Sequence, residues 1–112
     1  MEVLQMNRNV NGTAREPHLE MYEAILTLKT LDECVMFFDD LCSVTELRAI
    51  EQRYQVARML YKGNIYNTIL EQTGASSATI SRVNRSLLYG KGSYDIVFNR
   101  LDMKDGEPEE DA

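Results

Sequence analysis

A single glycine between two helical segments constrains the fold of this 112-residue chain more than any other feature. Thr73-Gly74-Ala75 separates two stretches in which apolar side chains recur at spacings of three and four, the pattern of amphipathic helices. Gly74 can adopt a backbone conformation in which a Cβ would clash, so the chain can turn sharply at this point. Two helices joined by so short a turn form a helix-turn-helix.

Helix start signals occur at three places before that motif. Pro17 can open a first helix, because the missing N–H of a proline costs nothing at the first helical position. Thr30-x-x-Glu33 and Ser43-x-x-Glu46 are capping boxes, in which a hydroxyl and a carboxylate satisfy N–H groups at a helix start. The second box is expected to open a long helix with an apolar stripe, whose members are Leu47, Ile50, Tyr54, Ala57 and Leu60.

The remaining helix boundaries are marked by glycines and polar caps. Lys62-Gly63 should end the long helix, and Asn64 should cap the helix that leads into the turn. Ser76 should cap the helix after the turn, which is expected to run to about Tyr89. A last helix is expected over about 94–101, with the apolar residues Ile96, Val97 and Leu101. No segment alternates apolar and polar residues, so we predict an all-α fold of about six helices.

The helix after Thr30 is apolar over more than half of its circumference. Its apolar residues are Cys34, Val35, Met36, Phe37, Phe38 and Leu41. A single short chain can hardly bury such a helix on most sides, so we expect two copies to form an intertwined homodimer. Cys34 and Cys42 are expected to be reduced, buried thiols, and Met21, Met36 and Met59 to fill the core.

The formal net charge of -6 hides an uneven distribution along the chain. Residues 1–42 carry a net charge of -5, residues 43–101 a net charge of +4, and residues 102–112 a net charge of -5. The basic middle segment is compatible with binding to DNA phosphates. We expect a flexible arm over 1–15, a helical DNA-binding and dimerisation domain over 16–101, and an acidic disordered tail over 102–112.

Several protein classes are disfavoured by features that the sequence lacks. It has no apolar run near 18 residues and no secretory signal, so we expect a cytoplasmic protein without a membrane partner. One histidine, His18, and two cysteines without ligand spacing predict no metal site. The sequence has no phosphate-binding glycine loop and no Ser/His/Asp constellation, so we do not expect an enzyme.

The helix after the turn divides into two faces. Ile80 and Val83 should face the core together with Ile69, Leu70 and Ala75. The opposite face carries small hydroxyl side chains and arginines, which suit a helix that enters the major groove and binds phosphates. The predicted DNA-binding residues, including two at the start of the preceding helix, are Tyr66, Asn67, Ser76, Ser77, Ala78, Thr79, Ser81, Arg82 and Arg85.

The segment Gly74-Ala75-Ser76-Ser77-Ala78-Thr79-Ile80-Ser81-Arg82 closely resembles the helix-turn-helix of the Trp repressor superfamily. The resemblance runs from about residue 20 to residue 101, through Leu31-Asp-Glu-Cys34, Phe37-Phe-Asp-Asp-Leu-Cys42, Gln52-Arg53, Val56-Ala-Arg-Met-Leu60, Lys62-Gly63 and Val83-Asn-Arg85. It implies an all-helical, intertwined homodimer that acts in transcription. It also implies two DNA-reading helices about 34 Å apart on successive major grooves.

The same resemblance implies a site for a small-molecule corepressor, whose identity stays open. The corresponding residues are Ser43, Arg53, Arg82 and Ser86, of which the two arginines could clamp a carboxylate. Other interpretations stay open at each position. Ser43 is also a helix cap, Arg53 can pair with a neighbouring carboxylate, Arg82 can bind phosphate, and Ser86 can be an exposed helical serine.

The sequence therefore predicts a homodimeric, sequence-specific DNA-binding transcriptional regulator, and a repressor that blocks sterically is the form we expect. Its partners would be double-stranded DNA and a second copy of the chain. A different class stays open, namely a helical protein-interaction adapter that keeps the fold without binding DNA. The acidic ends of the chain favour that alternative.

Overall fold

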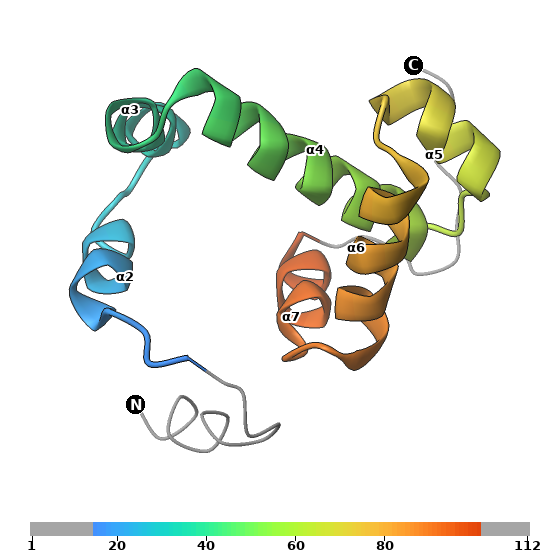
Figure 1. Cartoon of the computed structure of the whole chain (residues 1–112). Helices are drawn as coiled ribbons and strands as arrows, with labels where there is room; N and C mark the ends of the chain where they lie inside the picture. Colours follow the sequence, from blue (N-terminus) through green and yellow to red (C-terminus); the bar gives the residue numbers. More distant parts are fainter. Residues whose placement is uncertain (1–14, 102–112) are drawn as a thin grey trace. The chain divides into compact units, whose positions relative to one another are not determined.

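The structure, a computed structural model, describes residues 15–101 (Figure 1). Within this range it has six helices and no strand, which confirms the predicted all-α class. The predicted acidic tail over 102–112, and the predicted arm over 1–15 apart from Arg15, lie outside the described residues. The chain divides into two compact units, Met1–Ser43 and Val44–Ala112, and each is described by itself.

The first unit contains α2 (Leu19–Ile25) and α3 (Leu31–Leu41). α2 begins two residues after Pro17, because His18 has an extended conformation with ψ of 99° and acts as the N-cap. α3 begins where its capping box predicts, and the backbone N–H of Glu33 donates to Thr30 Oγ1 at 3.1 Å. The Glu33 carboxylate accepts from the backbone N–H of Lys29 at 2.9 Å. In this capping box the carboxylate therefore bonds to the residue before the N-cap and not to the N-cap itself.

The second unit contains α4 (Val44–Tyr61), α5 (Tyr66–Thr73), α6 (Ser77–Tyr89) and α7 (Ser93–Arg100). α4 packs against both α5 and α6, and α5 also contacts α6 (Figure 1). α4 begins one residue after Ser43 and ends before Gly63, whose positive φ of 89° stops the helix. The long helix and its two boundaries therefore agree with the sequence.

Asn64 has a different role from the one predicted. Its side-chain amide donates to the carbonyl of Met59 at 3.1 Å, so it closes the end of α4. The N-cap of α5 is Ile65, which offers no side-chain cap. The prediction that Asn64 caps α5 is therefore wrong, because α5 begins at Tyr66 and its N-cap position falls on Ile65, one residue later than predicted.

All nine buried residues of the described range belong to the second unit. They are Val56, Ala57, Met59, Tyr61, Ile69, Ala75, Ile80, Val83 and Phe98. Phe98 is fully buried among three tyrosines, with ring centroids 4.6 Å from Tyr61, 5.8 Å from Tyr94 and 5.9 Å from Tyr54. This aromatic cluster joins α7 to α4 and holds the last helix in the unit.

Two apolar stripes predicted from the sequence are only partly correct. Of the α4 stripe, only Ala57 is buried, while Leu47 and Leu60 are half-buried and Ile50 and Tyr54 are exposed. Three apolar residues predicted for the last helix, Ile96, Val97 and Leu101, are exposed, and Phe98 is buried in their place. Helical spacing alone does not show which of two apolar faces of a short helix is buried. Here the face with Phe98 is buried, because tyrosines of α4 and α7 pack against it.

The first unit buries no residue of either helix. Cys34 and Cys42 are free, as predicted, but only half-buried, so the expectation of buried thiols is wrong for the single chain. Met59 fills the core as predicted, whereas Met21 and Met36 are exposed. Among the described helices, none combines the length and apolar character that crossing a membrane requires.

Candidate nucleic-acid interface

The turn between α5 and α6 is built around Gly74. This residue caps α5 in the left-handed conformation with φ of 69°, and its N–H donates to the carbonyl of Leu70 at 3.0 Å. The Thr73 hydroxyl donates to the carbonyl of Ile69 at 2.7 Å and accepts from the N–H of Ala75 at 3.1 Å. The predicted turn thus has a helix-terminating glycine and a side chain that bonds to the backbone on both sides of it.

Ser76 starts the second helix of the motif. Its hydroxyl accepts from the N–H of Thr79 at 3.1 Å and donates to the Thr79 hydroxyl at 3.0 Å. The other N–H groups of the first turn point along the helix axis toward the exposed end, where backbone donors favour anionic groups such as phosphates. The predicted cap is confirmed, and it fixes where the outer face of α6 begins.

α6 divides into the two faces that the sequence predicts. Ile80 and Val83 are buried, with 0% and 3% of their side chains exposed, and they pack in the core with Ile69 and Ala75. The opposite face of the motif is open to solvent, and its exposed members are Ser76, Ser77, Ala78, Ser81, Arg82 and Arg85. Thr79 is half-buried at the edge between the faces.

Tyr66 and Asn67 occupy the first turn of α5, at the end of that helix remote from Gly74. Both residues are exposed, so they are free to meet a phosphate backbone. All nine predicted DNA-binding residues therefore reach the surface at least in part. Their contacts with DNA stay predictions.

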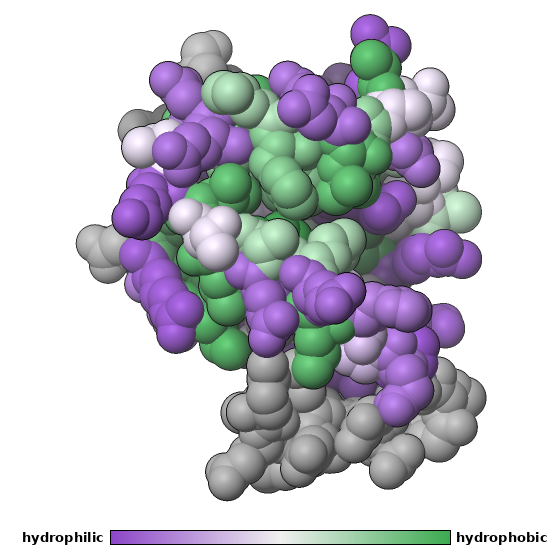
Figure 2. All heavy atoms as spheres, turned by 90° about the vertical axis from the view of Figure 1, so that its left-hand side faces the viewer, coloured by the Kyte–Doolittle hydropathy of each residue, from purple (hydrophilic) through white to green (hydrophobic). Residues whose placement is uncertain are grey.

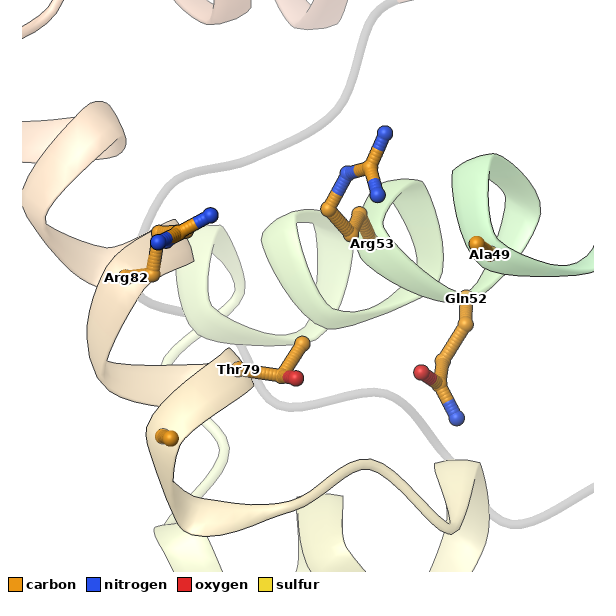
Figure 3. A pocket seen from close by; sticks show the side chains of 6 residues that line it. Ala49, Gln52, Arg53, Thr79 and Arg82 are labelled. Atoms are coloured by element: carbon orange, nitrogen blue, oxygen red, sulfur yellow. The ribbon is translucent and has the colours of Figure 1, made fainter. Parts of the chain in front are cut away.

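A pocket of about 280 Å³ lies where α4 meets the first turns of α6. It is lined by Ala49, Gln52, Arg53, Ala78, Thr79 and Arg82. Arg53 from α4 and Arg82 from α6 extend on the same side of α4, whereas Gln52 points away from them (Figure 3). The alanines leave space between the two helices, and the guanidinium groups make the pocket suitable for an anionic group.

The structure thus brings together two of the four residues that resemblance assigned to a corepressor. Arg53 and Arg82 share the pocket, while Ser86 is exposed and does not line it. Ser43 belongs to the first unit and is likewise not a lining residue. Four further lining residues were not predicted for a corepressor site, namely Ala49, Gln52, Ala78 and Thr79. Ala49 and Ala78 lie four residues before Arg53 and Arg82, and this helical spacing was the available signal.

Comparison with known proteins bears directly on this arrangement. The family model described as Trp repressor protein matches residues 17–102, which include all six described helices and the whole motif. The chain belongs to the Trp repressor family. This family is one of helix-turn-helix proteins of DNA-binding transcription regulation, and it is a regulatory family and not an enzyme family.

Similar proteins come from several bacteria. The uncharacterized protein YerC of Bacillus subtilis is 50% identical over 82 residues, which cover 73% of this chain and 79% of YerC. The crystal structure of a candidate Trp repressor from Staphylococcus aureus matches with a TM-score of 0.76 and 42% identity, over 94% of this chain and 98% of that one. A TrpR-like protein from Eubacterium eligens matches with a TM-score of 0.73 and 52% identity, over 77% and 89% of the two chains. The fold is therefore of the Trp repressor type.

Proposed function

We propose that this chain is a homodimeric, sequence-specific DNA-binding transcriptional regulator that represses by occupying its site. The division of α6 into two faces carries this proposal. Ile80 and Val83 anchor one face in the core, which leaves an exposed face of small hydroxyl side chains with Arg82 and Arg85. A helix of this kind can enter the major groove without large side chains that would hold it away from the base edges.

The exposed residues divide into two groups by chemistry. Ser77, Ala78 and Ser81 are short and would approach base edges. Arg82 and Arg85, with Tyr66 and Asn67 on α5, would bind phosphates and set the register on the duplex. The net charge of +4 over residues 43–101 supports this contact within an otherwise acidic chain.

Exposed apolar side chains support the homodimer. In α3, Leu31 is 80% exposed and Met36 is 63% exposed, and no residue of this helix is buried. Leu88 and Tyr89 at the end of α6 are exposed as well. Figure 2 shows hydrophobic side chains open to the surface among charged ones. Burial against a second copy would remove this apolar surface from water, at about 25 cal/mol for each Å².

The Arg53–Arg82 pocket supports the further proposal that a small anionic corepressor regulates DNA binding. A ligand that bridges α4 and α6 would stabilise the position of α6, and a ligand that binds only the folded state raises the melting temperature. Thermal-shift screening of amino acids and aromatic metabolites tests this proposal. Loss of any observed shift in Arg53→Ala would place the ligand in the pocket, whereas an unchanged shift would place it elsewhere.

Selection of binding sites from a random duplex library, followed by affinity measurements across a salt series, tests the DNA-binding function. Arg85→Ala should weaken binding about equally on all sequences and reduce the slope of log affinity against log salt by about one. Ser77→Ala should instead alter the base preference. Arg100→Ala removes an exposed arginine from the end of α7, outside the motif, and serves as the matched control.

One alternative has specific support. The net charge of -6 suits a helical adapter that binds a protein and not DNA. The salt series separates the two functions, because a phosphate-binding protein binds random duplex tightly at low salt. Absence of any duplex binding at low salt would reject the regulator and favour the adapter.

A further inference from the structure

Gln52 connects the pocket to the turn of the helix-turn-helix. It extends from α4 into the pocket lining, and its side-chain amide donates to the backbone carbonyl of Thr73 at 3.1 Å. The bond spans 21 residues and is partly buried. Figure 3 shows Gln52 pointing away from the side of α4 that carries Arg53.

The acceptor of this bond lies at a critical place. Thr73 is the last residue of α5, and the carbonyls of a final helical turn have no partner within the helix. Its hydroxyl already bonds to Ile69 and Ala75, so the Gln52 amide adds a connection that leaves the local motif altogether. Gln52 thus connects the backbone of the turn to α4 through a side-chain hydrogen bond.

We propose that Gln52 is a positioning residue that holds the α5–α6 turn against α4 and thereby sets where α6 begins relative to the rest of the unit. The inference rests on the proposed DNA-binding function, because positioning matters for reading base edges. Ile80 and Val83 fix the middle of α6 in the core, four and seven residues beyond the cap at Ser76. The first turn of α6 carries the exposed Ser77 and Ala78 and follows directly on the turn that Gln52 bonds to.

The alternative would be that Gln52 only adds stability. A purely stabilising residue would change binding to preferred and random duplex by the same factor, since both depend on the folded fraction. A positioning residue changes them unequally, because phosphate contacts tolerate a shift of the helix that base contacts do not. The ratio of the two affinities therefore separates the two roles.

The test compares Gln52→Met with Gln72→Met in the full-length protein. Methionine keeps the length and helix preference of glutamine but cannot donate a hydrogen bond to the carbonyl. Gln72 is exposed on α5, one residue before Thr73, and is the matched control. Gln52→Met should lower the preference for the selected site over random duplex about fivefold, and Gln72→Met should leave the preference unchanged.

A second readout does not depend on DNA. Amide hydrogen exchange should become faster at Gly74 and Ala75 in Gln52→Met, while the amide of Ile80, which donates to Ser76 O, keeps its protection. Gln52→Glu should give a larger effect than Gln52→Met, because a carboxylate would face the Thr73 carbonyl. Gln72→Glu adds the same charge without that contact.

The outcomes distinguish the two proposals. Unchanged exchange at Gly74 and Ala75 together with an unchanged affinity ratio would overturn the role of Gln52. An equal loss of both affinities, or faster exchange throughout the unit, would also overturn it in favour of general stability. Faster exchange confined to the turn in a protein that binds no duplex would keep the mechanical role of Gln52 and reject the DNA-binding function.

Discussion

The two units of this chain bury their apolar residues to very different extents. The second unit, with α4 to α7, contains every fully buried residue of the described range and gathers its aromatic rings around Phe98. The first unit has helices of similar apolar character, yet buries none of their residues. In the proposed homodimer, a second copy would supply the packing that α3 does not find within its own unit.

The difference assigns separate tasks to the two regions. The second unit has its own core and places the helix-turn-helix on it, so its geometry is set within one chain. The first unit is suited to dimerisation because its apolar residues are available to another copy. Four predictions can break or sharpen this comparison, and they follow in order of expected effect.

Phe98→Ala should have the largest effect, because it removes the centre of the aromatic cluster in the second unit. We expect the free energy of unfolding to fall by about 3–5 kcal/mol, as for other buried phenylalanines. Chemical denaturation measures the change, and Asn99→Ala, at an exposed neighbour, should change it by less than about 0.5 kcal/mol. A cost near that of the control would show that this unit does not depend on its own core.

Met36→Glu should disrupt self-association while leaving the second unit folded. Burial of a methionine side chain stabilises by about 1.5–3 kcal/mol, and a charge at that position adds a desolvation cost. Sedimentation equilibrium should therefore show the dimer dissociating at concentrations at least about tenfold higher than in the wild type. Asp40→Ser, on the exposed surface of the same helix, is the control. If Met36→Glu and the wild type associated equally well, α3 would not be part of the dimer interface.

Gly74→Ala should cost about 1–2 kcal/mol, through backbone strain alone. Gly74 has φ of 69°, and a Cβ added there would meet no heavy atom within 4 Å. Gly92→Ala is the matched control, with φ of 85° and an equally open site at the start of α7. Both variants should lose similar stability in denaturation, but only Gly74→Ala should also weaken DNA binding. Equal affinities for the two variants would contradict the role of the turn in placing α6.

The smallest effects concern two helix caps, one in each unit, that make the same hydrogen bond to the backbone. Thr30 and Ser76 each accept a backbone N–H at 3.1 Å, and replacement of such a cap by alanine costs about 1 kcal/mol. Ser76→Ala should lower the global unfolding free energy, because α6 belongs to the core. Thr30→Ala should mainly accelerate hydrogen exchange in α3. The opposite outcome, in which Thr30→Ala lowers the global unfolding free energy and Ser76→Ala changes only local exchange, would contradict the placement of the core in the second unit.

Features encoded by neighbouring residues were predictable from the sequence. The caps at Thr30 and Ser76, the glycine turn at Gly74 and the buried pair Ile80 and Val83 all depend on spacings of four residues or fewer. Such signals act through backbone geometry and local hydrogen bonds, which a sequence displays directly. These local helix signals were sufficient to predict the all-α class.

Features that depend on distant residues were harder to predict. Burial of Phe98 requires Tyr54 and Tyr61 of α4, about 40 positions earlier, and the bond from Gln52 to Thr73 spans 21 residues. Asn64 could bond to either neighbouring helix, and the outcome depended on the residue at which α5 begins. In the candidate site, outward-facing residues were predictable from periodicity, whereas the pocket required the packing of α4 against α6.

The hydroxyl pair at the start of α6 has a consequence for how protons are arranged at the exposed end of this helix. Ser76 and Thr79 have two hydroxyl hydrogens between them, and their mutual bond at 3.0 Å uses one. The Ser76 oxygen also accepts a backbone N–H, so its own proton is committed inside the protein. Phosphate oxygens only accept hydrogen bonds, so in the proposed complex with DNA the proton left to offer them would belong to Thr79. The half-buried threonine would then be the donor at this edge of the helix, and the exposed serine would orient it.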